Sequence, residues 1–157
     1  EPGWGGYVSD GVYELPPNGS NVKIPENKYI VVDVKLPKLK YLQIEGVLEF
    51  DNNLDNTLEA DIIFINGGQL IIGWENNPIE KEINIILTGE ESSTNFYLPN
   101  GYETIGGKAI GVYGGLDLHG KPRYVSWTKL NSTSKTGTNT ISLKDPVDWE
   151  ISIKLYY

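Results

Sequence analysis

Three stretches of the chain repeat one pattern, in which apolar residues alternate with other residues around a central glycine. The central glycines are Gly46, Gly68 and Gly114, with Leu, Ile, Val or Phe at every second position on either side. Gly46 and Gly68 are 22 residues apart, and Gly68 and Gly114 are 46 apart, about twice that distance. Residues 83–89 lie where an intermediate copy is expected, and we interpret them as a weaker copy. This repetition predicts a stack of similar β units.

The repeat favours an all-β fold, a short right-handed β-solenoid similar to a parallel β-helix, with loops inserted between its coils. One coil cannot bury its own apolar face, so several coils must stack. Glycine is favoured where the backbone turns tightly or where coils approach closely. The doubled Gly67-Gly68 predicts a β-bulge or a one-residue slip at such a corner. A β-sandwich with evenly spaced strands would give the same spacing, and this alternative stays open.

Composition limits the possible partners and cofactors. The 157 residues suit one domain, over 1–157, in which residues 1–18 form an N-terminal cap or arm. The net charge of -8 and the single arginine do not provide the basic surface that nucleic acids require. The apolar runs are far shorter than the roughly 20 residues that cross a bilayer, so we expect no direct membrane insertion. The chain has no cysteine, which excludes thiol chemistry, and we expect no cofactor.

The only histidine and the only arginine, His119 and Arg123, lie close together and are followed by Trp127. A histidine suits general-base catalysis near neutral pH, but a carboxylate or a nucleophile usually accompanies it. Asp117 is two residues away, whereas the glycine and proline that follow the histidine are typical of a turn. We therefore favour a turn between strands and predict no catalytic residue. His119, Arg123 and Trp127 are candidates for a ligand-binding edge.

Two further groups of polar residues are candidate sites. Asp51, Asn53 and Asp55 alternate in one loop and offer the oxygen ligands that calcium prefers, but they lack the glycine and glutamate of an EF-hand. Side chains that close a loop by hydrogen bonds to its backbone are the commoner explanation, so we predict no metal site. Asn18 and Asn131 each begin an Asn-x-Ser/Thr sequence and are candidate glycosylation sites.

Several motifs in a fixed order resemble a known family. These motifs are NGSNVKIP, LQIEGVLEF, GGQLIIGWENNP, GGLDLHGKP, WTKL and DPVDWE. Together they resemble the eight-glycine domain of fibrocystin-like (fibrocystin-L) receptors and of CEMIP and transmembrane hyaluronan-binding proteins, from about Gly19 to Trp149. The family glycines would be Gly19, Gly46, Gly68, Gly73, Gly89, Gly114, Gly120 and Gly137. The pattern departs at Ile151, where a Gly-Asp pair is expected, which leaves the C-terminal boundary open.

The resemblance implies a non-catalytic extracellular module of a larger, membrane-anchored or secreted cell-surface protein. Such a module would serve adhesion, ligand binding or the architecture of the ectodomain. Its expected partners are neighbouring domains of the same parent chain and a glycan or protein ligand. The alternative is a carbohydrate-binding or catalytic part of a hyaluronan-degrading enzyme. A third interpretation is a structural cap whose exposed coil face docks the next β-helical domain.

Overall fold

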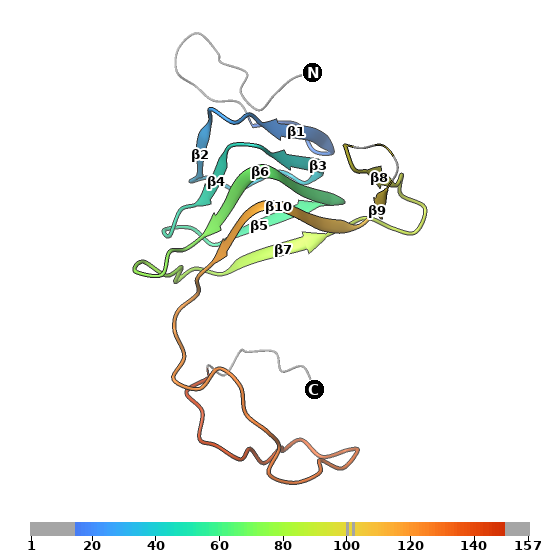
Figure 1. The fold of residues 1–157 in the computed structure, drawn as a ribbon. Helices are drawn as coiled ribbons and strands as arrows, with labels where there is room; N and C mark the ends of the chain where they lie inside the picture. Colours follow the sequence, from blue (N-terminus) through green and yellow to red (C-terminus); the bar gives the residue numbers. More distant parts are fainter. Residues whose placement is uncertain (1–14, 100, 102, 150–157) are drawn as a thin grey trace. The chain divides into compact units, whose positions relative to one another are not determined.

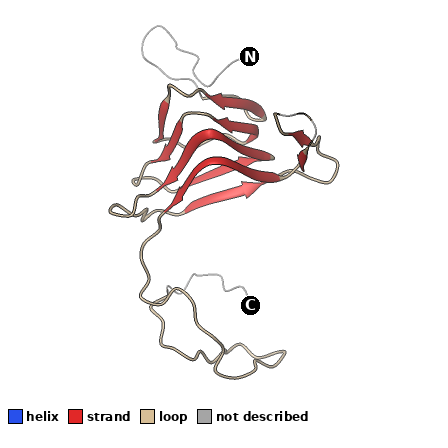
Figure 2. Cartoon of the chain, in the orientation of Figure 1, coloured by secondary structure: helices blue, strands red, loops and turns tan. Residues whose placement is uncertain are grey.

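The computed structural model describes residues 15–99, 101 and 103–149, which form two compact units divided after Gly120. The described residues of the first unit form ten strands, and the all-β prediction is confirmed (Figures 1 and 2). The strands are β1 (Ser20–Ile24), β2 (Tyr29–Val32), β3 (Leu39–Ile44), β4 (Val47–Phe50), β5 (Asn56–Ala60), β6 (Ile62–Ile72), β7 (Ile83–Leu87), β8 (Phe96–Tyr97), β9 (Thr104–Gly106) and β10 (Ala109–Leu118). The described ranges contain no helix long and apolar enough to cross a membrane.

A curled, six-stranded parallel sheet is the main element of the first unit. Its order is β1-β3-β6-β4-β2, and β10 also pairs with β6. The long strand β6 pairs with β3 along its first half and with β4 along its second half. A separate parallel pair, β5 and β7, lies behind this sheet in Figure 1. This parallel pairing differs from the antiparallel pairing that is typical of β-sandwiches.

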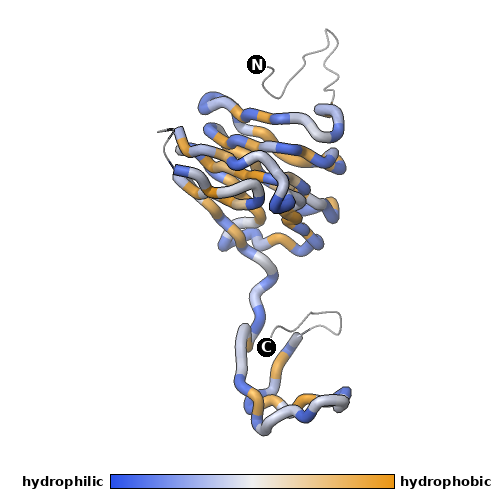
Figure 3. Tube along the Cα trace, turned by 90° about the vertical axis from the view of Figure 1, so that its right-hand side faces the viewer, coloured by the Kyte–Doolittle hydropathy of each residue, from blue (hydrophilic) through white to orange (hydrophobic). Residues whose placement is uncertain are grey.

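The register of the parallel strands places the apolar residues of successive strands side by side. Ile24 pairs with Ile44, Ile44 with Ile65, and Ile65 with Val112. The first three of these are completely buried, in a core shared with Leu58 of β5. Apolar and polar residues alternate along much of the sheet in Figure 3, as the period of two in a half-buried strand requires, whereas β6 is apolar at consecutive positions. The alternation in the sequence therefore produces rows of side chains that run across the sheet.

The repeated glycines form a column at the bend of the sheet. A Cβ atom on Gly46 would lie 2.3 Å from the carbonyl oxygens of Pro25 and Lys28, and one on Gly68 would lie 2.3 Å from that of Gly46. A Cβ on Gly114 would lie 2.2 Å from the carbonyl oxygen of Gly68. The prediction that glycine allows adjacent strands to approach closely at this corner is therefore confirmed.

The doubled glycine of β6 forms the predicted irregularity. Tyr113 pairs with Asn66 and Gly115 pairs with Gln69, so that two residues of β6 face one residue of β10. This is the two-to-one pairing of a β-bulge, and Gly67 has a φ of 79° that glycine adopts readily. The bulge prediction for Gly67-Gly68 is therefore confirmed.

The prediction of a weaker copy in residues 83–89 is wrong. These residues form β7, which pairs with β5 in the separate two-stranded sheet and does not join the glycine column. The doubled spacing between Gly68 and Gly114 instead accommodates β7 and the antiparallel pair β8 and β9. The two short strands β8 and β9 thus lie between β7 and β10.

The second unit is described from Lys121 to Trp149 and is held by contacts between distant residues. Leu130 and Leu143 form an isolated antiparallel bridge, and the carboxylate of Asp148 accepts hydrogen bonds from the backbone N–H groups of Tyr124 and Val125. The bond from the Tyr124 N–H contributes most to lowering the pKa of Asp148. The prediction of one domain over 1–157 stays a prediction. Most of the proposed cap, residues 1–14, and the sequence that departs from the family pattern from Ile151 onward lie outside the described residues.

Candidate functional site

His119 follows the last residue of β10 and is fixed mainly through its backbone. Its N–H donates to the carbonyl of Ile72 at 2.8 Å, and its carbonyl accepts from the N–H of Ile79 at 2.8 Å. The imidazole Nε2 lies 4.0 Å from Asp117 Oδ1, too far for a hydrogen bond. Asp117 instead accepts a hydrogen bond from Gln69 Nε2 at 2.6 Å. No hydrogen bond from Asp117 therefore orients the imidazole as a general base would require.

The other two members of the predicted binding edge lie in the second unit. Trp127 is 72% exposed, and Arg123 is half-buried. His119 belongs to the first unit, which ends at Gly120. A shared surface of His119, Arg123 and Trp127 stays a prediction.

The side chains of the candidate calcium loop make hydrogen bonds within the protein. Asn53 Nδ2 donates to Asp51 Oδ1 at 2.8 Å, and Asp55 Oδ1 accepts from the backbone N–H of Glu82 at 3.0 Å. Asn56, the next residue, is 3% exposed and connects three backbone groups. Within the described ranges, no group of three or more His, Cys, Asp or Glu residues could hold a metal ion. The geometry favours loop closure by polar side chains, which is the commoner explanation given above.

Both candidate glycosylation residues are exposed. Asn18 Oδ1 accepts a hydrogen bond from the backbone N–H of Lys38 at 3.0 Å, and Asn131 Nδ2 lies 3.4 Å from Ser142 Oγ. Exposure is required for a glycan to be attached, so both residues remain candidates.

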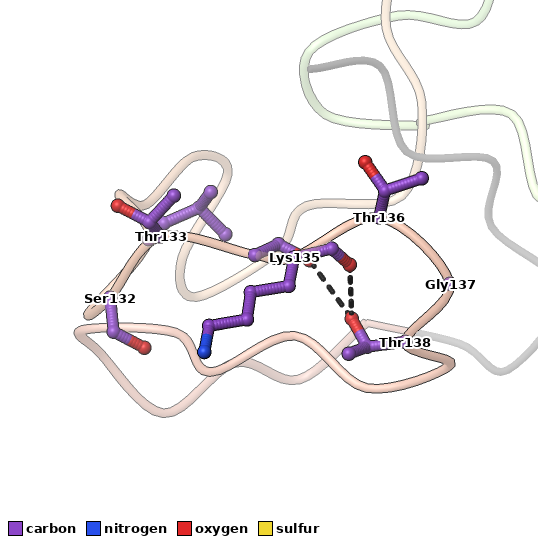
Figure 4. Close-up of a pocket in the computed structure, with 8 residues that line it drawn as sticks. Ser132, Thr133, Lys135, Thr136, Gly137 and Thr138 are labelled. Carbon is purple, nitrogen blue, oxygen red and sulfur yellow. Dashed lines mark hydrogen bonds between the residues drawn. The ribbon is translucent and has the colours of Figure 1, made fainter.

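A polar hollow in the second unit is lined by Leu130 and residues 132–138 (Figure 4). Its wall is a turn in which the Lys135 carbonyl accepts from the N–H of Thr138 at 3.2 Å and from Thr138 Oγ1 at 2.8 Å. Among the residues that line it, Lys135 is the only ionisable one. The hollow therefore lacks the pair of acid and base groups that hydrolytic chemistry requires.

The edge of β10 that faces away from β6 exposes the alternating apolar side chains on either side of Gly114. Ile110, Val112, Leu116 and Leu118 are 38%, 42%, 39% and 54% exposed. Their partners in β6 are Ile63, Ile65, Leu70 and Ile72, which are at most 6% exposed. The four residues therefore extend the rows of apolar core side chains, and β6 is the only described strand that pairs with them.

The same four residues present backbone groups at the open edge. In a parallel sheet, alternate residues of a strand bond to the neighbour on each side. The N–H groups of Ala109 and His119 donate to the carbonyls of Asp61 and Ile72, so the odd-numbered residues of β10 face β6. The even-numbered residues face outward, and β10 pairs with no strand other than β6 among the described residues. The outer side of β10 therefore has both exposed apolar side chains and backbone groups that no other described strand pairs with.

A second exposed feature joins two aromatic residues through one carboxylate. Glu49 of β4 accepts hydrogen bonds from the Tyr29 hydroxyl and, at 2.8 Å, from Trp74 Nε1. Trp74 lies in a tight turn closed by reciprocal backbone bonds with Asn77. The bond to Glu49, followed by burial and by the charge of Glu49, raises the pKa of Tyr29 to about 12. Trp74 and Glu49 are 25 positions apart, so no local pattern in the sequence predicts this contact.

The Glu49 contact predicts a change in the titration of Tyr29. We expect Glu49→Gln to lower the pKa of Tyr29 from about 12 towards its usual value of about 10. In the original chain the raised pKa contributes stability that is complete below about pH 10 and is lost as the pH rises towards 12. Tyrosinate absorbance as a function of pH measures this change. Glu75→Gln, in the Trp74 turn, is the control, and equal titration curves for the two variants would contradict the prediction.

Comparison with known proteins identifies the family. The model of the G8 domain matches residues 3–131. Mouse fibrocystin-L is 41% identical over 148 residues, covering 88% of this chain and 4% of the mouse protein. Canine fibrocystin is 37% identical over 150 residues, covering 95% of this chain and 4% of the canine protein. No solved structure matches the chain. The match over most of the sequence, including the three glycines of the column, shows that this chain belongs to the G8 domain family.

Proposed function

We propose that the chain is a non-catalytic extracellular module of a larger cell-surface protein, and that it serves the architecture of the ectodomain. The chain spans about 4% of the length of the fibrocystin relatives that it matches, which supports a role as one part of a long chain. The open edge of β10 supports the architectural role most strongly. At this edge the rows of apolar core side chains end on a strand that pairs with no other described strand on its outer side. Adhesion and ligand binding are the alternative roles that the family resemblance implies for such a module.

We further propose that the first unit is a short β-solenoid. Parallel pairing of β1, β3, β6 and β10, aligned rows of apolar residues, and the glycine column support this proposal. In a solenoid each coil contacts only its neighbours, so a terminal coil needs a cap or a following coil. The location of the module outside the cell, in a membrane-anchored or secreted parent, rests on its family, and exposed Asn18 and Asn131 are compatible with a glycoprotein.

The non-catalytic role predicts that the chain leaves hyaluronan intact. Residues 1–157 are incubated with high-molecular-mass hyaluronan, and the polymer is sized by light scattering after gel filtration, with a known hyaluronidase as the positive control. We expect no change in polymer mass, because Asp117 does not orient His119 through a hydrogen bond. Depolymerisation that is abolished by His119→Ala would refute the proposal and support the enzymatic alternative. Glycan binding without turnover that is removed by Trp127→Ala would instead add a ligand-binding role.

A further inference from the structure

We infer that the open edge of β10 is a docking site for one more parallel β-strand, supplied by the rest of a longer chain. This inference rests on the proposed role of the chain as a module of a larger protein, and it specifies the site and the chemistry of the junction. The occupant is a strand with Val, Ile or Leu at alternate positions and a glycine opposite Gly114. The geometry of β10 and the length of the relatives outside the matched region support this choice.

Among the described residues, the apolar rows of the core end on β10, and no further strand covers them. Val112 follows the fully buried Ile44 and Ile65, and Leu116 follows the fully buried Leu70. Each of these exposed side chains therefore packs against a buried apolar residue of β6 on one side and faces no described strand on the other side. Covering such side chains removes apolar area from water, which is the main driving force for association. A strand with apolar residues at the matching positions would extend each row by one residue.

β10 lacks the short length, the lysine and the proline that often protect a free strand edge. Free edges are commonly short or carry lysine or proline, which prevents pairing with other strands. The two other edge strands of the sheet follow this rule, because β1 has 5 residues, including Lys23, and β2 has 4. β10 has 10 residues, contains no lysine or proline, and directs the N–H and C=O groups of its even-numbered residues outward. The length and composition of β10 favour an edge that is paired in the complete protein.

The glycine column determines one residue of the occupant. The space that a side chain on Gly68 would need is filled by the carbonyl of Gly46, and the space at Gly114 is filled by the carbonyl of Gly68. A strand placed in the same way against β10 would meet the carbonyl of Gly114. Only glycine avoids that contact, so the occupant needs a glycine at this position.

A second copy of this chain fits the edge less well. Two-fold symmetry would place the two β10 edges antiparallel to each other. All the strand pairs in the six-stranded sheet are parallel, and their apolar rows depend on that register. A parallel strand continues both the hydrogen bonds and the rows. The relatives have about 96% of their length outside the matched region, which can supply such a strand.

Hydrogen exchange tests the inference. Residues 1–157 alone and the longest natural chain that contains them are compared by hydrogen–deuterium exchange with mass spectrometry. We expect the outward amides of Ile110, Val112, Leu116 and Leu118 to exchange roughly 100-fold or more slowly in the longer chain, because they become hydrogen-bonded. Val112→Lys in the longer chain should remove this protection. Val31→Lys is the matched control, since Val31 is 49% exposed on β2 and lies away from the β10 edge, and it should leave the protection unchanged.

The possible outcomes separate this inference from the proposed function. Equal exchange of β10 in the short and long chains would overturn the docking inference, while the absence of hyaluronan degradation would still support the non-catalytic role. Sedimentation of residues 1–157 at two concentrations tests the rival occupant. Protection of β10 that rises with concentration in the short chain would show a second copy at the edge and overturn the inference as stated. Protection of β10 only in the longer chain, removed by Val112→Lys but not by Val31→Lys, supports it.

Discussion

Gly68→Ala is expected to destabilise the chain by about 3 kcal/mol or more, or to prevent folding, because the added methyl group has no space. Its Cβ would lie 2.3 Å from the carbonyl oxygen of Gly46 and 2.7 Å from that of Ile44. Both contacts are with backbone atoms, which cannot move aside as the end of a flexible side chain can. The substitution therefore forces β6 away from the bend between β3 and β4.

The backbone atoms around Gly68 that this substitution displaces also form hydrogen bonds between the strands. The Gly46 carbonyl accepts from the N–H of Gln69 at 2.9 Å, at the point where β6 passes from β3 to β4. Moving Gly68 away from Gly46 lengthens this bond and disturbs the pairing on both sides of the bend. Chemical denaturation followed by circular dichroism measures the loss as a lower midpoint.

Gly120→Ala is the matched control for Gly68→Ala. A Cβ atom at Gly120 meets nothing within 4 Å, and its φ is not in the left-handed region. This control should change the free energy of unfolding by less than about 0.5 kcal/mol. If Gly68→Ala unfolds at the same denaturant concentration as the control, the close approach of strands at the glycine column is not required for stability.

The periodicity of the sequence predicts much of this fold. Alternating apolar residues around Gly46, Gly68 and Gly114 are sufficient to place β3, β4, β6 and β10, the bend and the bulge. The reason is local, because a half-buried strand and a crowded corner each require a particular residue type at a particular position. The partner of a strand is not a local property. Residues 83–89 have the same alternating apolar pattern, yet they pair with β5 in the separate two-stranded sheet.

The candidate site shows a different limit of sequence analysis. His119 and Arg123 stand out because each is the only residue of its kind, but rarity says nothing about position, so the edge that they would share with Trp127 stays a prediction. The β10 row has the alternating pattern of a buried strand, and no local signal shows that one of its sides is uncovered. The contact between Glu49 and Trp74 joins residues 25 positions apart, a pairing set by the register of the sheet.

Asn56→Ala is expected to lower the free energy of unfolding by about 2 kcal/mol, because it removes three hydrogen bonds that a buried side chain makes to partly buried backbone groups. Asn56 is 3% exposed at the start of β5. Its Oδ1 accepts from the backbone N–H of Leu36 at 3.3 Å and of Thr57 at 2.9 Å, and its Nδ2 donates to the carbonyl of Val34 at 2.7 Å. One side chain thus connects the segment between β2 and β3 to β5. Alanine removes all three bonds and adds no polar replacement.

Asn53→Ala tests whether this effect depends on burial. Asn53 is an asparagine in the same loop, but it is exposed, and its side chain donates to Asp51 at 2.8 Å. Its loss should cost less than about 0.5 kcal/mol, since water can replace the exposed hydrogen bond. Denaturation midpoints of the two variants give the comparison, and equal midpoints would contradict the structural role of Asn56. A larger loss of unfolding free energy for Asn56→Ala would show that Asn56 stabilises this loop more than Asn53, one of the candidate calcium ligands, does. The buried amide of Asn56 both donates and accepts hydrogen bonds inside the protein, which explains why this position favours asparagine.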